Sequence, residues 1–344
     1  MGSQSSKWIW ATVVAVLALA AVMGVVTLRH EASVRVPAPA EANPAPGSAD
    51  AAGELTYRRL TRPARTQVRD SAGRLLAVLT DGARTVRISG PERVFKEERF
   101  TSATVTTDGW IRLAPKPWAA GAERQPWFRP WLSEELRDRT PDALALAMEY
   151  ADGAPVRKDA KGVVYSGDAS FGPLSANDPD GRAENSDFYD YMGVAWDSPD
   201  GKHERPDKAH YRSLDCSGFI RMVYGYRMKY PLLGKNTKGS GLPRRAYAMA
   251  ALGPGKLLIP NTGRPARDYG LLQEGDLIFF SHGEEAGPTI QHSAIYVGVD
   301  DSGHHRFMSS RVKADGPTFG DLGGESLLDG PGYWSGRFLT ARRI

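Results

Sequence analysis

The sequence contains a single cysteine, Cys216, among 344 residues. A lone cysteine cannot form an internal disulfide, and it cannot supply a zinc site that needs several cysteines. Proteins outside the cytoplasm usually pair their cysteines or lose them, because a free thiol there is open to oxidation. If the chain is exported, its one retained cysteine is a candidate nucleophile. The alternative is a structural role as a small buried hydrophobe.

The chain also lacks a dense Lys/Arg stripe with interleaved aromatic residues, and no nucleic-acid-binding motif is recognisable. Its formal charge is only +4. This mild excess predicts a solvated basic surface, with attraction to an anionic polymer such as a cell wall as the alternative. Nucleic acid is therefore excluded as the partner, and no motif identifies a protein partner.

One long apolar run stands near the start of the chain, at Trp8–Leu28. About 20 apolar residues are enough to cross a bilayer as a helix, whereas the apolar core of a secretory signal is usually shorter. The run predicts a transmembrane anchor within residues 1–30, with the folded part outside the cytoplasm. Ala40-Glu41-Ala42 could be a cleavage site, in which case the protein would be secreted.

The rest of the chain divides into three predicted parts. Residues 31–54 are rich in Ala and Pro and predict an extended tether. Residues 55–118 contain short β-rich runs and predict a small β module, with a turn at Asp108-Gly109. Residues 119–344 predict the catalytic domain, entered through a helix capped by Thr140. Trp118, Trp127 and Trp131 predict a packing contact between the two folded parts, with a sugar-stacking surface as the alternative.

The segment around Cys216 has the pattern of a helix that begins at the cysteine. Apolar residues at Phe219, Ile220 and Val223 have the spacing of a buried helical face, and Asp215 before Cys216 is a good helix-start residue. The start of a helix offers free backbone amides and the positive end of its dipole, which favour a thiolate. This placement predicts a cysteine nucleophile.

A cysteine nucleophile needs a base mounted rigidly within hydrogen-bond reach of its sulfur. His292 begins a short apolar strand, HSAIYVGV, after a first strand, LIFF, that follows Glu274-Gly275-Asp276. The other six histidines lie next to the apolar run, in charged stretches or in polar turns. His292 is therefore the predicted base.

LDCSGF, EGDLIFF and HSAIYVG, in this order, resemble the NlpC-type family of bacterial cell-wall cysteine peptidases, the NlpC and p-sixty superfamily. The resemblance covers roughly residues 187–344. It implies a papain-like α+β fold with Cys216 as nucleophile and His292 as general base. It also implies cleavage of peptidoglycan stem peptides, typically between D-Glu and a diamino acid, and this chemistry needs no metal or organic cofactor.

Further site residues are carried over from the resemblance one by one. Asp215 and Ser217 match positions that help to grip the amino end of the stem peptide. Tyr191 resembles a tyrosine upstream of the cysteine that lines the site. In the later insertion, Arg244 and Arg245 could meet stem-peptide carboxylates, with an ordinary exposed surface as the alternative.

The third catalytic position departs from the family pattern. The family places a polar residue, often His, on the strand after the histidine strand, whereas this chain has Ser309 there. A serine can accept a hydrogen bond from the imidazole but carries no charge, so it would orient His292 without strongly stabilising an imidazolium. The alternatives are that His305 or Asp301 serves from the preceding turn.

Together these features predict a membrane-anchored, extracytoplasmic cysteine endopeptidase that acts on peptidoglycan. Two alternatives stay open. One is an amidase or acyltransferase on the same scaffold, because Cys and His on such a fold serve several acyl transfers. The other is a catalytically weak module that binds the cell wall or organises a complex.

Overall fold

The computed structural model describes residues 54–176, 178, 181–282 and 289–344. The predicted transmembrane anchor and the predicted tether up to residue 53 lie outside the described residues. Within the described part, no helix combines the length and apolar character needed to cross a membrane. The fold is mixed α/β with many strands and few helices, as the sequence predicts.

Residues 56–113 form a five-stranded antiparallel sheet in which each strand pairs with the next, from β1 to β5. The strands are β1 (Thr56–Thr61), β2 (Ala64–Arg69), β3 (Leu75–Thr80), β4 (Thr85–Lys96) and β5 (Thr104–Leu113). The predicted turn at Asp108-Gly109 is wrong, because both residues lie inside β5 and Gly109 pairs with Ser89 of β4. The two β-rich runs on either side of this dipeptide are therefore one long strand.

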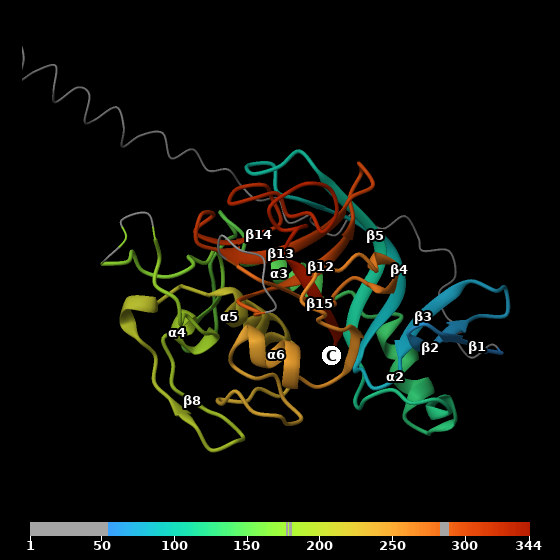
Figure 1. The fold of residues 1–344 in the computed structure, drawn as a ribbon. Coiled ribbons are helices and arrows are strands. Elements are labelled where there is room, and N and C mark those ends of the chain that lie inside the picture. Colours follow the sequence, from blue (N-terminus) through green and yellow to red (C-terminus); the bar gives the residue numbers. More distant parts are fainter. Residues whose placement is uncertain (1–53, 177, 179–180, 283–288) are drawn as a thin grey trace, which may run out of the picture. The chain divides into compact units, whose positions relative to one another are not determined.

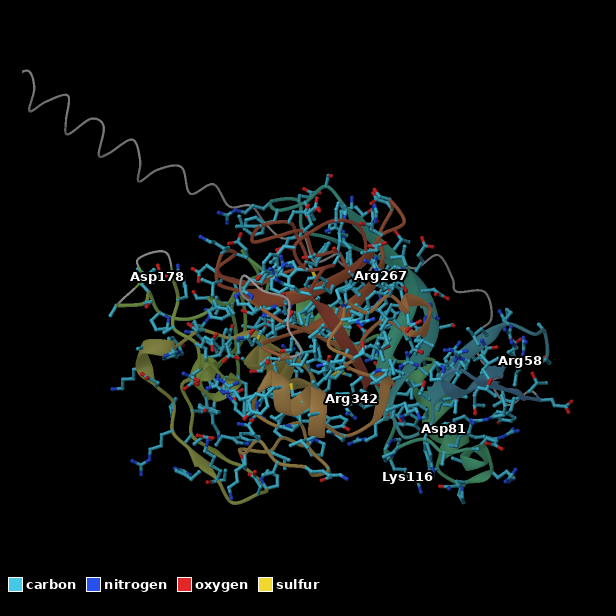
Figure 2. The ribbon with its side chains drawn as sticks, in the orientation of Figure 1. Arg58, Asp81, Lys116, Asp178, Arg267 and Arg342 are labelled. Carbon is cyan, nitrogen blue, oxygen red and sulfur yellow. The ribbon has the colours of Figure 1, made fainter. Side chains whose placement is uncertain are left out.

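The tryptophans that follow this sheet pack against it. Trp118 and Trp131 are buried with the apolar residues of the five strands, and Trp127 is partly buried beside them. The ring of Phe128 lies 5.0 Å from that of Trp118. These contacts favour the packing role over a sugar-stacking surface. Arg58 and Lys116 are exposed at the edge of this part of the chain (Figure 2).

The second sheet has six strands in the order β10-β15-β11-β12-β13-β14, and all of its pairs are antiparallel. Its strands are β10 (Lys256–Ile259), β11 (Leu277–Phe280), β12 (His292–Val299), β13 (His305–Arg311), β14 (Gly316–Thr318) and β15 (Phe338–Arg343). Two further strand pairs are β6 (Arg157–Lys158) with β7 (Val164–Ser166) and β8 (Trp196–Asp197) with β9 (His203–Glu204).

The helices are short. They are α2 (Phe128–Glu135), α3 (Ala143–Met148), α4 (Phe188–Met192), α5 (Cys216–Ile220) and α6 (Ala246–Leu252), with the π-helix η3 (Arg221–Arg227) directly after α5. Three 3-10 helices are η1 (Ala122–Arg124), η2 (Lys208–His210) and η4 (Tyr269–Leu271). The helix expected after Thr140 is α3. Its cap is Asp142, whose side chain accepts from the backbone of Ala145 at 3.1 Å.

The six-stranded sheet is buried on both faces. Helices α5 and α6 pack against its central strands (Figure 1). In β11, Leu277 and Phe279 belong to the core shared with these helices, while Ile278 and Phe280 belong to the core on the opposite face. Successive side chains of a strand point to opposite faces, so the unbroken apolar run LIFF is what a doubly covered strand requires.

The two sheets are joined by polar contacts at the ends of the C-terminal strand and of β4. The side chain of Thr85 donates to the carbonyl oxygen of Ile344 at 2.7 Å. After β4, the buried Glu97 accepts from the Thr318 hydroxyl at 2.7 Å and from the backbone N–H of Phe319 at 2.8 Å. Burial raises the pKa of Glu97 to about 7, although these hydrogen bonds and the charge of Arg311 act in the opposite direction.

Glu97→Gln is expected to remove a pH dependence of stability. Between pH 4.5, the ordinary value, and about 7, folded Glu97 holds a proton that the unfolded chain releases, so wild-type stability falls as the pH rises through this range. When the pH is raised from 4 to 8, the free energy of unfolding of wild type should fall by about 3 kcal/mol more than that of Glu97→Gln, and equilibrium unfolding measures this difference. Glu98→Gln, an exposed neighbour, is the control. If wild type and Glu97→Gln lost equal stability between pH 4 and pH 8, the raised pKa of Glu97 would be contradicted.

Candidate active site

Cys216 is the first residue of α5, as the sequence predicts. The Asp215 side chain caps the helix by accepting from the backbone N–H of Gly218 at 2.7 Å. Gly218 is needed at this point, because a β-carbon there would collide with the carbonyl oxygen of Ser186. The start of α5 is thus held against the segment that precedes α4.

The Cys216 thiol lies against Ser293, the residue that follows His292 on β12. Only 9% of Cys216 is exposed. Burial raises the pKa of the thiol to about 12, the charge of Asp215 acts in the same direction, and the contacts with Ser293 oppose both. Burial and the charge of Asp215 thus act against the thiolate that the helix start is expected to favour.

His292 begins β12 and pairs with Phe280 of β11, so the imidazole has the strand mount that the sequence predicts. Helix α5 packs on β12, and the charge of Asp215 acts on both Cys216 and His292. Burial lowers the pKa of His292 well below its ordinary value, and the charges of Arg311 and His282 lower it further. Both shifts favour a neutral thiol and a neutral imidazole.

Asp215 and Ser217, predicted to grip the amino end of the substrate, are both engaged by Arg244. The guanidinium donates to Asp215 Oδ2 at 2.8 Å and to Ser217 Oγ at 2.7 Å. Burial alone would raise the pKa of Asp215, but the charge and hydrogen bond of Arg244 outweigh it, and the pKa lies below its ordinary value. Arg244 therefore already engages both side chains to which the resemblance gives a contact with the substrate's amino end.

Arg244 belongs to a buried cluster of two cations and two anions. Its Nε lies 3.1 Å from Asp187 Oδ2, and Arg221 Nε lies 2.9 Å from the same oxygen. Arg244 is only 7% exposed, and Asp187 and Arg221 are fully buried. The alternative of an ordinary exposed surface is therefore wrong for Arg244, and its contact with stem-peptide carboxylates stays a prediction. The cluster instead joins the segment before α4 to the start of α5.

Tyr191 is fully buried, and its hydroxyl donates to the carbonyl oxygen of Gly167 at 2.8 Å. Its ring packs edge-on against Tyr150 at 5.4 Å. The structure therefore places Tyr191 in the core rather than in the lining of the site that the resemblance suggests.

Ser309, the predicted third member, does not hold the imidazole. Its hydroxyl oxygen accepts from Arg311 Nε at 3.0 Å, while His292 Nε2 is buried without a hydrogen-bond partner among the described residues. Continuing the register from the pair Ile295–Met308 places Ser309 across from Ala294, diagonal to His292. Diagonal neighbours are about 7–8 Å apart, a span that a long side chain bridges and a serine does not.

The two alternatives for the third member lie at the other end of β12. His305 pairs with Val299, the last residue of β12, and Asp301 accepts from the backbone N–H of Thr104 at 3.2 Å. A strand rises about 3.3 Å per residue, so the seven steps from His292 to Val299 span about 23 Å. Neither His305 nor Asp301 reaches His292.

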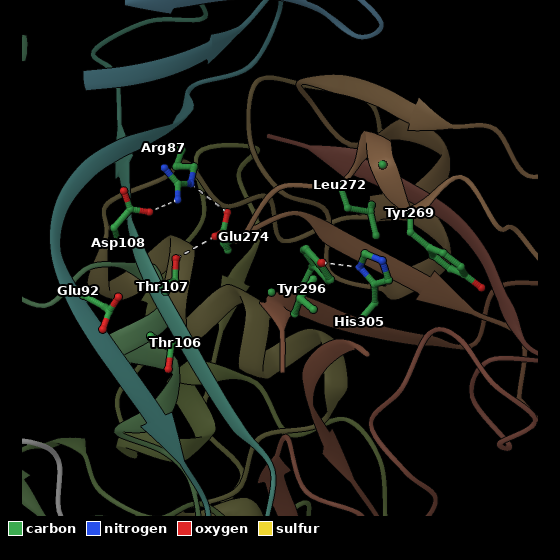
Figure 3. A pocket seen from close by; sticks show the side chains of 13 residues that line it. Arg87, Glu92, Thr106, Thr107, Asp108, Tyr269, Leu272, Glu274, Tyr296 and His305 are labelled. Carbon is green, nitrogen blue, oxygen red and sulfur yellow. Dashed lines mark hydrogen bonds and ion pairs between the residues drawn. The ribbon is translucent and has the colours of Figure 1, made fainter. Parts of the chain in front are cut away.

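His305 instead lines a pocket of about 490 Å³ between β4–β5 and the far end of β12 (Figure 3). The Tyr296 hydroxyl lies 2.6 Å from His305 Nδ1 at one side of this pocket. At the other side Arg87 contacts Asp108 and Glu274, and Thr107 donates to Glu274 at 2.9 Å. Glu274 of the motif EGDLIFF is thus a contact between the two sheets.

Sequence reasoning missed two side chains beside His292. The Trp334 ring stacks on the imidazole with centroids 4.5 Å apart and an interplanar angle of 30°. Arg311 lies over Trp334 and acts on His292 through its charge. The signal for Arg311 was present, because it follows Ser309 by two positions on one strand and so shares its face. No pattern pointed to Trp334, which lies in the turn before β15.

The site combines a helix-borne cysteine with a strand-borne histidine. No group of His, Cys, Asp and Glu side chains suited to a metal ion occurs in the described part of the chain. A cysteine at a helix start beside a histidine on a strand is the pairing that nucleophilic catalysis by a thiol uses.

The family comparison agrees with this class. Residues 200–343, which contain Cys216 and His292, match the model of the NlpC/P60 family. The resemblance found in the three motifs is confirmed. The matched family suggests a cell-wall peptidase or hydrolase activity. A search of curated proteins gave no match.

Proposed function

We propose that the protein is a papain-like cysteine endopeptidase that hydrolyses amide bonds in peptidoglycan stem peptides, between D-Glu and a diamino acid. The observation that carries the proposal is the contact of Cys216, at the start of α5, with Ser293 beside His292, inside the segment that matches the NlpC/P60 family.

The mechanism starts from the neutral pair. His292 takes the thiol proton as Cys216 Sγ attacks the amide carbonyl, which gives a tetrahedral intermediate. The imidazolium then returns this proton to the leaving amine, and a thioester on Cys216 remains. Water attacks the thioester with His292 as general base, which releases the carboxylate product and restores the thiol. A neutral imidazole is the form that this first step requires, and its lowered pKa keeps it available.

The substrate of this site does not need a free amino end. Asp215 and Ser217 would have to release Arg244 before they could bind an ammonium group, and Arg244 also pairs with the buried Asp187. Breaking a buried ion pair costs several kcal/mol. Stem peptides still attached to the glycan strand, which have no free amino end, are therefore proposed as the substrate.

The test is digestion of intact peptidoglycan by the full chain, with products identified by mass spectrometry. The proposal expects fragments that end in D-Glu and a matching set with a newly free amino group on the diamino acid. Release of whole stem peptides from the glycan would favour the amidase alternative. Binding of the protein to peptidoglycan without any release would favour the cell-wall-binding alternative.

We also propose that the catalytic domain works outside the cytoplasm. The support is the apolar run Trp8–Leu28 followed by an Ala/Pro-rich stretch, which fits an anchored domain acting on the wall at a distance from the membrane. Fractionation of cells followed by protease treatment of intact spheroplasts tests this. Protection of residues 54–344 from the external protease would contradict it.

A further inference from the structure

We propose that Trp334 and Arg311 are the positioning residues of the Cys216–His292 site, in place of a polar side chain that hydrogen-bonds to the imidazole. The proposal rests on the proposed function, because it concerns how the base of that reaction is held. It concerns two residues on different elements, one in the turn before β15 and one at the end of β13.

The first support is the way His292 is held. The imidazole stacks on the Trp334 indole at 4.5 Å, and its Nε2 atom is buried with no hydrogen-bond partner among the described residues. A histidine base without an acceptor at this nitrogen must be oriented by packing. The nearly parallel indole restricts rotation of the imidazole, and this replaces the orienting hydrogen bond.

The second support is that Trp334 is itself fixed. It is 2% exposed, and its Nε1–H donates to the carbonyl oxygen of Gly323 at 3.1 Å. The rings of Phe280 and Phe307 meet it edge-on at 5.2 and 5.9 Å. A ring held on several sides in this way is a rigid platform for the imidazole.

The third support is the position of Arg311. Register continued from Ile295–Met308 places Arg311 across the sheet from His292, and its guanidinium lies 5.5 Å from the centre of the Trp334 ring. The guanidinium donates hydrogen bonds to Ser309 Oγ at 3.0 Å, to the carbonyl oxygen of Gly324 at 2.5 Å and to the hydroxyl oxygen of Ser326. Ser309 therefore supports Arg311 rather than His292.

The charges around His292 come from three elements. Arg311 on β13 and His282 after β11 disfavour the imidazolium, while Asp215 before α5 favours it. Burial lowers the pKa of Arg311 to about 9, so its guanidinium stays charged at neutral pH. Burial is the largest cause of the lowered pKa of His292, and the charge of Arg311 adds to it, so both favour the unprotonated imidazole that accepts the thiol proton. The indole face partly stabilises the imidazolium once it forms, as aromatic faces do for cations.

The direct test is a pH titration of the histidine ring protons by NMR, in the full chain, with His292 assigned by its loss in His292→Gln. In wild type, the ring protons of His292 should show an upfield ring-current shift. The imidazole should stay neutral in the pH range where exposed histidines titrate. Trp334→Leu should remove the upfield shift. Arg311→Met should move the titration midpoint up by about one pH unit.

Trp131→Leu, a buried tryptophan in the other core, is the matched control and should leave the His292 resonance in place. If Trp334→Leu does not fold, Trp334→Phe serves instead, and a smaller ring should retain only part of the upfield shift. A folded Trp334 variant with an unchanged His292 shift, or an unchanged midpoint in Arg311→Met, would overturn the proposal.

Turnover of peptidoglycan gives a second readout. Trp334→Leu should lower kcat by more than tenfold with little change in KM. Trp334→Phe should have a kcat close to that of wild type. Ser309→Ala should lower kcat by less than Trp334→Leu does. A larger loss in Ser309→Ala would return the orienting role to Ser309. The NMR result does not depend on turnover, so a failure of the proposed function is distinguishable from a failure of this inference.

Discussion

Arg244→Met is expected to lower the free energy of unfolding by about 3–5 kcal/mol, the usual cost of leaving a buried charge without its partner. Arg244 lies between Asp215 and Asp187, at 2.8 and 3.1 Å, and all three side chains are almost inaccessible to solvent. Without the guanidinium, Asp215 keeps only its contacts with Ser217 and backbone amides. Chemical denaturation at pH 7 measures the loss.

Arg245→Met is the matched control. Its guanidinium is 36% exposed and lies 3.9 Å from Glu184, so its removal is expected to cost less than about 1 kcal/mol. The free energy of unfolding of Arg244→Lys should be closer to that of Arg244→Met than to that of wild type, because an ammonium group cannot replace a planar guanidinium that donates to two carboxylates. Equal stability of the Arg244 and Arg245 variants would contradict the importance of the cluster.

Alkylation of Cys216 in the free protein is expected to be roughly a thousandfold slower at pH 7 than alkylation of an exposed cysteine, whose pKa is about 8.5. The thiolate is the reactive form, and burial raises the pKa of this thiol to about 12. The rate should therefore rise about tenfold per pH unit without a plateau near neutrality. Because the chain has one cysteine, labelling with iodoacetamide reports on Cys216 alone.

The denatured chain, labelled at the same pH, supplies the rate of the exposed thiol. A plateau with a midpoint below pH 7 would mean that Cys216 and His292 form an ion pair in the free protein, and would contradict the neutral-pair mechanism. The buried thiol indicates that slow labelling is compatible with activity, with proton transfer to His292 occurring during the attack.

The parts of the site that could be predicted from sequence are those set by local pattern. The Asp-Cys-Ser-Gly run contains both the cap and the close-approach glycine of α5, and the apolar runs before and after His292 are the strands β11 and β12. Each of these features depends on residues within a few positions, which periodicity and capping rules describe.

The parts that could not be predicted depend on contacts between distant residues. Arg244 meets Asp187 across 57 positions, since 244 − 187 = 57, and no local pattern records that contact. Trp334 reaches His292 only because β15 is inserted between β10 and β11. Asp108-Gly109 has the composition of a turn, yet pairing with β4 keeps it in a strand. At Asp108-Gly109 tertiary packing overrode the local signal, whereas the contacts of Arg244 and Trp334 had no local signal.

The most direct test of the central claim is the rate at which soluble fragments are released from intact peptidoglycan by wild type and by Cys216→Ala. The account predicts release by wild type and none above background by the variant, with both proteins equally folded and equally bound to the wall. Release by Cys216→Ala at the wild-type rate would contradict a cysteine nucleophile at the start of α5.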